Sequence, residues 1–296
     1  MNIIRRAVSW IRRNVGFYNL SRIGNPFLDL FTGGKKRPVF FDIDKTVPAL
    51  RAIDAAYNEI RAELERLLPY QDQMPRYHDL DTDLLYSSGR FHRDKRWNVF
   101  MLRCLESFPE ENRKLCPKTC AVLDSIPYIN QAFFSILDPG KSIPAHTGPT
   151  RSYLRYHLGL RVPANKPPQI RVRDQYYTWK EGESVLFDDS WEHEIYNNAD
   201  EVRAVLIVDV MRPFIRPIFA INLVSRKLAE RFYGPRIVAR ANAYRLPPTS
   251  LVQPAAEESR GSWAVVEAEQ KARHESNRRT ASERTRITSN IFERPG

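Results

Sequence analysis

Apolar and polar positions between residues 131 and 210 alternate in short runs that turn residues separate. The runs read AFFSIL, RSYLRYHLGLRV, QIRVRD, QYYTWK, ESVLFDD, HEIYNN and RAVLIVDV. Many short β-type segments at this spacing are typical of a sandwich or a small barrel. A further short strand is predicted over residues 38–43, which read PVFFDI. The pattern therefore predicts a mainly β domain.

Helical periodicity flanks this β region on both sides. Residues 46–68 carry an apolar stripe at helical spacing, which consists of Leu50, Ile53, Tyr57, Ile60 and Leu64. For residues 69–130 we predict mixed structure, with Pro, Asp and aromatic residues in loops. Residues 214–245 again show helical spacing, in an apolar stripe of Ile218, Ile221, Val224, Leu228 and Phe232. Arginines accompany this second stripe, so we expect a basic amphipathic helical segment there.

Residues 1–24 form another basic amphipathic segment. On a helix, one face is apolar and consists of Ile4, Val8, Ile11, Val15 and Tyr18, and no acidic residue occurs before Asp29. A basic helix without acids is typical of an element that lies on a membrane surface. A terminal helix docked on its own domain and a mitochondrial transit peptide are the alternative interpretations.

Charge narrows the class of partner. The net charge of +11 favours an anionic partner such as nucleic acid, a phospholipid surface or small acids. The arginines stand beside large aliphatic faces, without an RNA-binding signature or a zinc finger, so we do not expect nucleic acid. No run of about 18 apolar residues is present that would span a bilayer as a helix.

Composition indicates a sizeable core in a reducing compartment. Hydrophobic residues make up 42% of the 296 positions. Cysteine is rare, and we expect Cys104, Cys116 and Cys120 to be ordinary buried or free thiols. Residues 247–296 are rich in Ser, Glu, Arg and Pro, and we predict that they are disordered.

Two histidines are candidate metal ligands. His146 lies in IPAHTGPT and His193 in SWEHEIYNN, on separate predicted strands. Two neutral imidazoles that close over one barrel mouth can bind Fe(II). Gly148 occupies the position where a non-haem iron oxygenase normally carries Asp. The alternative is that each His is a core residue with satisfied hydrogen bonds.

Two arginines are candidates for binding an anion near this metal. Arg203 opens the apolar run RAVLIVDV, where a buried guanidinium is costly without an anion. A carboxylate ligand could supply that anion through a bidentate pair. Arg155 and His157 alternate with apolar residues, so the period of two turns both toward the same interior. The alternative is an arginine at a strand edge or on the surface.

Two long segments resemble the aspartyl/asparaginyl β-hydroxylase family. They read FSILDPGKSIPAHTGPTRSYLRYHLGL and WKEGESVLFDDSWEHEIYNNADEVRAVLIVDVMRP. Members of this family are Fe(II)- and 2-oxoglutarate-dependent dioxygenases, and the signature covers roughly residues 90–213. The resemblance implies a dioxygenase domain over residues 38–213 that is mainly β with flanking helices, around a double-stranded β-helix core of jelly-roll or cupin-like type.

The resemblance also implies a role for particular residues. His146 and His193 would bind iron, and family members with HTG fill the position of the missing carboxylate with water. The residues expected around 2-oxoglutarate are Ser135, Arg155, His157 and Arg203. Arg203 would pair with the distal carboxylate of 2-oxoglutarate, and Trp97 would line the pocket. Alternatively, Arg155 would face the substrate instead of 2-oxoglutarate. O₂ is the second co-substrate, and ascorbate is expected to assist.

Three interpretations of the function remain open. The basic amphipathic segments favour hydroxylation of an acyl chain of a membrane lipid, such as an ornithine lipid or lipid A. Anionic lipid attracts such segments by about 1 kcal/mol per charge. The details HTGPT and EHE speak for the alternative, β-hydroxylation of a peptidyl Asp or Asn, because lipid A acyl-chain hydroxylases keep an Asp at the position of Gly148. The third interpretation is a non-catalytic binding module. The lipid interpretation places the protein in the cytoplasm, peripheral on the inner face of the membrane, and leaves its oligomeric state open.

Overall fold

The computed structural model describes residues 21–81 and 95–247 of the chain. All of them belong to one compact unit, which lies within Met1–Val252. Nearly all of the predicted N-terminal amphipathic segment and of the predicted disordered tail lies outside the described residues. Those two expectations therefore stay predictions.

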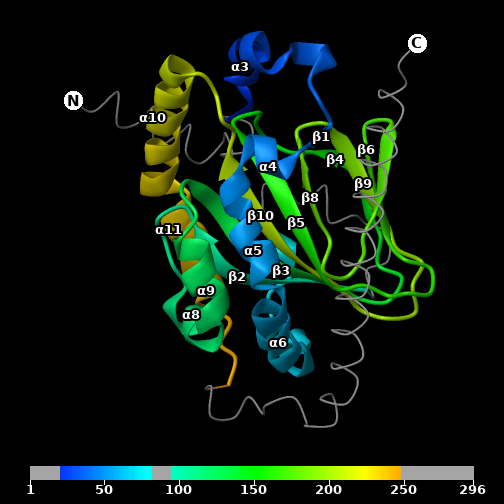
Figure 1. Ribbon diagram of the computed structural model, residues 1–296. Helices are drawn as coiled ribbons and strands as arrows, with labels where there is room; N and C mark the ends of the chain where they lie inside the picture. Colours follow the sequence, from blue (N-terminus) through cyan, green and yellow to red (C-terminus); the bar gives the residue numbers. More distant parts are fainter. Residues whose placement is uncertain (1–20, 82–94, 248–296) are drawn as a thin grey trace, which may run out of the picture. The chain divides into compact units, whose positions relative to one another are not determined.

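Ten described strands form two antiparallel sheets (Figure 1). The larger sheet has the order β1 (Phe40–Phe41), β8 (Ser184–Phe187), β5 (Tyr153–Arg161), β10 (Arg203–Met211), β3 (Ile129–Leu137) and β2 (Trp97–Cys104). The smaller sheet has the order β4 (Ile143–Thr147), β9 (Glu192–Tyr196), β6 (Gln169–Val172) and β7 (Gln175–Thr178). The fold class is thus the predicted one, mainly β with flanking helices around a jelly-roll-type core.

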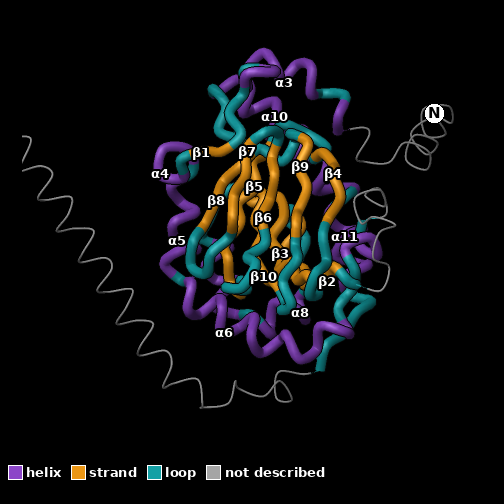
Figure 2. The backbone as a smooth tube through the Cα atoms, turned by 90° about the vertical axis from the view of Figure 1, so that its right-hand side faces the viewer, coloured by secondary structure: helices purple, strands orange, loops and turns teal. Residues whose placement is uncertain are grey.

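The larger sheet is buried on both faces, as β10 illustrates. All nine residues of this strand are buried. Leu206 and Val208 pack in the cluster that contains Leu64, which lies on one of the helices that cover this sheet. Val205 and Ile207 alternate with them and pack in the cluster that contains Ile195 of the smaller sheet. The period of two therefore divides each central strand between two cores, and the second core lies between the two sheets. In Figure 2 the strands of the smaller sheet lie over those of the larger sheet.

Short helices cover the outer face of the larger sheet. They are α4 (Ile43–Thr46), η2 (Pro48–Leu50), α5 (Arg51–Ala55), α6 (Tyr57–Leu67), η3 (Leu68–Gln73), α8 (Glu110–Leu115) and α9 (Pro117–Asp124). The stripe predicted over residues 46–68 is mostly buried, but the helix is interrupted at Ala56. Buried Glu63 accepts hydrogen bonds from the amides of Lys118 and Thr119, both at 2.8 Å, and so caps α9.

The region between residues 69 and 130 is more regular than predicted. It contains β2, with all eight residues buried. Because helices cover one face of β2 and the inner core covers the other, the strand lacks the alternation of a half-exposed strand. Local periodicity therefore did not identify this strand within the region for which mixed structure was predicted.

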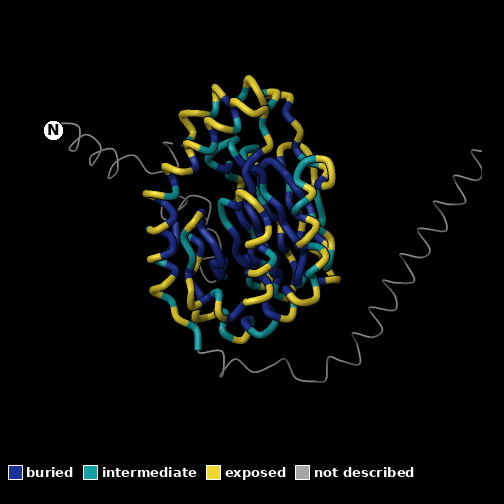
Figure 3. Tube along the Cα trace, turned by 60° about the vertical axis from the view of Figure 1, so that its left-hand side comes forward, coloured by how far each residue is buried: buried dark blue, intermediate teal, exposed yellow. Residues whose placement is uncertain are grey.

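The remaining helices lie at the ends and along one edge of the larger sheet (Figure 1). They are α3 (Asn25–Thr32), η1 (Gly34–Lys36), α7 (Tyr77–Leu80), α10 (Arg216–Phe232) and α11 (Gly234–Ala241). The last two occupy the segment predicted to be helical after the final strand. Of the stripe predicted there, Ile218 is buried, but the other four members are exposed. Figure 3 shows that buried positions are concentrated inside the described fold and exposed positions on its outside. Among the described helices, none has the length and hydropathy needed to cross a bilayer.

Candidate functional site

The two candidate metal ligands face each other across one strand pair. His146 on β4 is directly opposite His193 on β9, and their ring centroids are 4.1 Å apart. Directly opposed residues on an antiparallel pair share one face of the sheet, which here is the face toward the larger sheet. His193 is 3% exposed, whereas His146 lies at a cavity wall with partial exposure.

Both imidazoles are held in the form that a metal requires. His146 Nδ1 lies 2.8 Å from the carbonyl oxygen of Pro144, and His193 Nδ1 lies 2.9 Å from that of Trp191. A carbonyl oxygen only accepts, so each Nδ1 carries the proton and each Nε2 keeps its lone pair. Burial lowers the pKa of His146 to about 4 and that of His193 well below its usual value, so both rings are neutral at pH 7.

Arg203 is buried at the start of β10, and the described residues give it no counter-ion. Its side chain is 0% exposed, and none of its three nitrogens has a hydrogen-bond partner among the described residues. Its guanidinium carbon lies 3.9 Å from the centroid of the Trp179 ring. Burial lowers the pKa of Arg203 to about 9, which still leaves it protonated at neutral pH. A buried cation in this state could pair with an anion, which the described residues do not provide.

Aromatic rings connect Arg203 to the histidine pair. His157 stacks on Trp179 with centroids 5.7 Å apart, and it also contacts Phe187, which in turn contacts His193. Both ring nitrogens of His157 and the indole nitrogen of Trp179 lack partners among the described residues. Burial first, and then the charge of Arg203, hold the pKa of His157 well below its usual value. This inner region is therefore apolar, positively charged and rich in unused donors.

Ser135 and Trp97 form a separate pair beside this region. The indole nitrogen of Trp97 donates to Ser135 Oγ at 3.0 Å, and both residues are buried. Ser135 is opposite Val205 on the neighbouring strand. Trp97 stacks on Tyr77 with centroids 4.2 Å apart and an angle of 3° between the rings. The stacked pair gives the site a rigid aromatic wall.

Arg155 differs from Arg203 because carboxylates neutralise it. Its Nε and Nη2 donate to the two carboxylate oxygens of Asp209, both at 2.7 Å. Its Nη1 lies 3.2 Å from Asp189 Oδ2. Residues Arg155 and Asp209 are opposite each other on β5 and β10, so the strand register itself builds the bidentate pair.

Asp189 is the site residue that the sequence did not reveal. Its Oδ2 accepts from the hydroxyl of Tyr153 at 3.0 Å, whereas its buried Oδ1 lacks a partner among the described residues. Burial raises the pKa of Asp189 to about 7, against the opposing effect of Arg155. Two consecutive acids at the end of an apolar strand, four residues before His193, were the signal that could have found it.

Gly148 and Asp189 share one space. A Cβ atom on Gly148 would lie 2.5–2.6 Å from all three carboxylate atoms of Asp189, closer than real atoms approach. The amide of Gly148 also donates to the carbonyl oxygen of Asp189 at 2.8 Å. The carboxylate that is absent from position 148 therefore has a counterpart from the β8–β9 connection, which occupies the room that a side chain at 148 would need.

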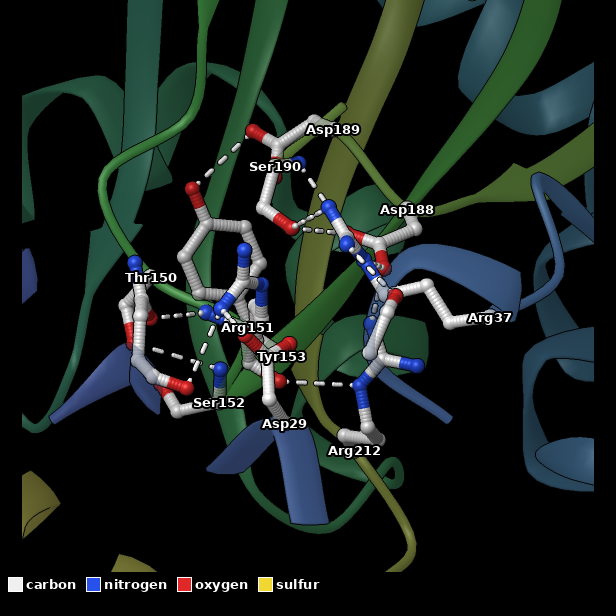
Figure 4. Close-up of polar contacts among 12 residues, drawn as sticks. Asp29, Arg37, Thr150, Arg151, Ser152, Tyr153, Asp188, Asp189, Ser190 and Arg212 are labelled. Atoms are coloured by element: carbon white, nitrogen blue, oxygen red, sulfur yellow. Dashed lines mark hydrogen bonds and ion pairs between the residues drawn. The ribbon is translucent and has the colours of Figure 1, made fainter. Parts of the chain in front are cut away.

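The neighbouring Asp188 anchors the β8–β9 connection through a separate network of ion pairs and hydrogen bonds (Figure 4). Its Oδ2 lies 2.8 Å from Arg37 Nε and 2.6 Å from Arg212 Nη2. Its Oδ1 accepts from the amide and the hydroxyl of Ser190. In Figure 4, Asp189 points toward Tyr153, away from this network. Asp188 thus fixes the backbone that positions Asp189.

A cavity of about 130 Å³ opens beside the histidines. Of the predicted site residues, four line it: Trp97, His146, Arg155 and His193. Ser135, His157 and Arg203 do not line it and lie buried around the inner region. Among the described residues, no group of three or more His, Cys, Asp and Glu side chains could hold a metal together. The candidate centre therefore consists of two histidines, with Asp189 close by but outside direct coordination.

The fold and this site define a two-sheet jelly-roll protein with a paired-histidine centre. A model of the family described as aspartyl/asparaginyl beta-hydroxylase matches residues 54–213. The match covers more than half of the chain, and the chain therefore belongs to this family. The resemblance noted in the sequence is thereby confirmed.

Two curated relatives show the range of the similarity. The chain is 42% identical over 185 residues to an ornithine lipid ester-linked acyl 2-hydroxylase of Rhizobium tropici, covering 62% of this chain and 64% of that protein. It is 39% identical over 126 residues to the aspartyl/asparaginyl beta-hydroxylase of Homo sapiens, covering 41% of this chain and 16% of that protein. The chain thus spans less than two thirds of the length of either relative.

Solved structures show only a weak likeness to the chain. The cupin domain of Schizosaccharomyces pombe Cnp3 is 10% identical with a TM-score of 0.27, over 40% of this chain and 62% of that one. A cupin 2 barrel protein of Salinispora arenicola is 9% identical with the same TM-score of 0.27, over 44% and 84%. At these scores the likeness carries no argument.

Proposed function

We propose that the protein is an Fe(II)- and 2-oxoglutarate-dependent hydroxylase that acts on an acyl chain of a membrane lipid. The observation that carries the proposal is the combination of two neutral, pre-oriented imidazoles with a buried arginine that has no anionic partner in the described part of the chain. The first suits a divalent metal and the second suits a dicarboxylate co-substrate. The name of the Rhizobium tropici relative supports the lipid substrate.

His146 and His193 would hold the iron through Nε2. Their donor set fits iron, because neutral imidazole is a common ligand of Fe(II) and the two Nδ1–H groups are already fixed by carbonyl oxygens. When bound, the iron, with 2-oxoglutarate and O₂, supplies the oxidising chemistry that converts an unactivated C–H bond into a C–OH group. Ascorbate would keep the iron reduced.

Arg203 would bind the distal carboxylate of 2-oxoglutarate. The planar guanidinium can donate two parallel hydrogen bonds to a carboxylate, and Trp179 behind it fixes its plane. His157 and Ser135 would complete this inner region as hydrogen-bonding groups. The apolar surroundings exclude water, which strengthens the pairing of the two charges.

Asp189 would orient water beside the histidine pair. Arg155 and Tyr153 hold its Oδ2, and its Oδ1 remains to accept a hydrogen bond. With a pKa raised to about 7, this carboxyl can hold or release a proton near neutral pH. It thus takes over the part of the carboxylate that is absent at Gly148 without entering the direct ligand set.

The charges around the cavity favour a neutral substrate chain. Arg155 is neutralised by Asp209 and Asp189. The second arginine of the lining, Arg226, lies 2.6 Å from Glu106 and also pairs with Glu230. The described lining thus has no unneutralised guanidinium for a peptidyl carboxylate. Its aromatic and aliphatic members suit a hydrocarbon chain, and they are Tyr77, Trp97, Leu105, Tyr153, Ala229 and Tyr233.

Peptidyl aspartate or asparagine is the second candidate substrate. The human relative supports it at 39% identity. A peptidyl aspartate would need a cation for its own carboxylate, and Arg155, already paired with Asp209 and Asp189, would have to exchange partners to supply it. The fold without catalysis is the third candidate, and it would leave the unpartnered Arg203 without a purpose.

The compartment belongs to the same proposal. We place the protein in the cytoplasm, peripheral on the inner face of the membrane. Cys104, Cys116 and Cys120 support a reducing compartment because all three are free and buried. Burial raises the pKa of each thiol, which keeps it protonated and unreactive.

The test is succinate release by the full chain with Fe(II), ascorbate and 2-oxoglutarate. An ornithine lipid in detergent and an aspartate-containing peptide are the two alternative substrates, and mass spectrometry identifies the hydroxylated product. We expect turnover with the lipid and its loss below detection in His146→Ala and His193→Ala. His78→Ala, outside the cavity, is the matched control and should keep full activity. Undiminished turnover in either site variant would overturn the metal assignment.

A further inference from the structure

Exposed apolar side chains are concentrated on two helical segments. Twelve large hydrophobic residues are exposed among the described part of the chain, and nine of them lie between residues 23 and 31 or between 215 and 232. Leu30 on α3 is 76% exposed, and Val224 and Leu228 on α10 are 61% and 60% exposed. Such a concentration differs from the scattered apolar residues of an ordinary surface and marks an interaction site.

The two segments adjoin because both are tied to the loop that follows β4. Asn25 of α3 donates to the carbonyl oxygen of Pro149 at 3.1 Å and accepts from the amide of Arg151 at 2.9 Å. Asn222 of α10 donates to the carbonyl oxygen of Ser152 at 2.8 Å. Phe31 and Ile215 also line one shared depression. We call the exposed surface of residues 23–36 and 215–231 the α3–α10 face.

The charges on this face have one sign. Between residues 21 and 37 and between 213 and 240, the acids are Asp29 and Glu230. Both are partly buried and paired, with Arg151 and Arg226 respectively. The exposed basic residues of the face are Lys35, Lys36, Arg216, Lys227 and Arg231. Large apolar side chains with a basic, acid-free rim are the pattern of a surface that inserts shallowly into anionic lipid.

The face borders the mouth of the cavity. Thr150 and Ser152 of the shared loop line the cavity, as do Asn222 and Ser225 of α10. We infer that the α3–α10 face docks the protein on a membrane that contains anionic phospholipid, with the cavity mouth toward the acyl chains. This inference rests on the proposed lipid substrate, because the docked orientation would let an acyl chain enter the cavity without leaving the bilayer.

The experiment measures co-sedimentation of the full chain with phosphatidylcholine vesicles, with and without phosphatidylglycerol, at low and high salt. Two variants alter the face without touching the cavity lining: Val224→Ser with Leu228→Ser, and Lys227→Glu with Arg231→Glu. We expect each pair to weaken binding to phosphatidylglycerol vesicles by roughly tenfold or more, with the charge pair losing its effect at high salt.

Matched controls remove the same chemistry elsewhere. Tyr176→Ser with Tyr196→Ser removes two exposed aromatic residues of the smaller sheet. Lys166→Glu with Lys180→Glu reverses two exposed charges in the β5–β6 and β7–β8 connections. Both control pairs should sediment like the parent chain. Equal weakening in the controls would overturn the assignment of the α3–α10 face.

Two alternatives to membrane docking through the α3–α10 face give distinct outcomes: docking through residues 1–20, and a second copy of the chain bound to the face. Vesicle binding that survives both face variants but disappears on deletion of residues 1–20 would assign docking to that segment and overturn the inference. A concentration-dependent dimer that both face variants dissociate, without vesicle binding, would assign the face to a second copy. Hydroxylation of detergent-dispersed lipid tests the proposed lipid substrate separately from the docking face. If that hydroxylation is absent, the substrate proposal is contradicted, and vesicle binding still tests the α3–α10 face.

Discussion

The two buried arginines of the site make an instructive comparison. Arg203 and Arg155 both point into the space between the sheets, but Arg203 has no counter-ion among the described residues, whereas Arg155 has two. Arg203 opens β10 opposite Leu137, and Arg155 sits within β5 opposite Asp209. The residue type is the same, and the strand register decides which guanidinium is available to an external anion.

The comparison shows why a buried charge must be interpreted together with its partners. A neutralised guanidinium such as Arg155 is part of the scaffold, because its removal would leave two carboxylates unpaired. An unneutralised guanidinium such as Arg203 lowers the stability of the unliganded protein and contributes its pairing energy only when a ligand arrives. If Arg203 binds the co-substrate as proposed, the inner region favours binding at a cost in stability. The region around Arg155, which we call the outer region, favours stability.

The largest expected effect is on the free energy of unfolding. Arg155→Met should lower it by about 3–5 kcal/mol, because Asp209 and Asp189 are left buried without their partner. Arg203→Met should have the opposite sign and leave the unliganded protein unchanged or more stable, because an unpaired buried charge is replaced by an apolar chain of similar volume. Urea titration of both variants measures the difference. Equal destabilisation by the two substitutions would contradict the comparison.

The next effect is on the co-substrate. Arg203→Lys should raise the KM for 2-oxoglutarate substantially, because a lysine cannot form the bidentate pair. Arg203→Ala should cost roughly 2–5 kcal/mol of binding. Parallel titrations with 2-oxoglutarate and thermal melts give two independent measurements, since the ligand should raise the Tm of the parent chain but not that of Arg203→Ala. If Arg155→Lys raised this KM more than Arg203→Lys did, the two roles would have to be exchanged.

A third, smaller effect concerns the space shared by Gly148 and Asp189. Gly148→Ala should destabilise the protein by about 1–3 kcal/mol, because its Cβ would overlap the carboxylate. In the double variant Gly148→Ala with Asp189→Ala the added methyl has room, so the two effects should be non-additive by about 1 kcal/mol. A double-mutant cycle by chemical denaturation measures this coupling. Simple additivity would show that Asp189 moves aside without cost.

The smallest effect is expected at Tyr153. Tyr153→Phe removes one hydrogen bond to Asp189 and should cost about 0.5–1.5 kcal/mol of stability. The same change should leave the KM for 2-oxoglutarate unaltered, because Tyr153 belongs to the outer region. A raised KM for 2-oxoglutarate would place Tyr153 in the inner region and contradict the separation of that region from the one around Arg155.

The sequence predicted the outline of this architecture from local pattern. Alternation and short apolar runs indicated the strands between residues 131 and 210, and the period of two placed Arg155 and His157 on one side. The strand β2 was missed because packing on both faces of the sheet removes the alternation of a half-exposed strand. The helix break at Ala56 was missed as well.

The sequence identified only those site residues whose type is unusual for their position. Histidines and a buried arginine are unusual in apolar strands, so His146, His193 and Arg203 could be selected from the sequence. The neutralisation of Arg155 by Asp209 depends on strand register, and the position of Asp189 depends on a turn, neither of which local sequence determines. The outward orientation of the α10 stripe was likewise invisible, since periodicity identifies an apolar face but not what covers it.

The close packing of Gly148 against Asp189 has a consequence for how this site can change by mutation. Position 148 cannot acquire an acidic side chain while Asp189 keeps its place, because the new Cβ would already overlap the existing carboxylate. A side chain at 148 acquired first would destabilise the protein, and loss of the acid at 189 first would leave Arg155 short of one partner. The path from this site to one with a carboxylate ligand at 148 therefore passes through a disfavoured intermediate sequence. The two positions are epistatic, and either order of substitution is disfavoured.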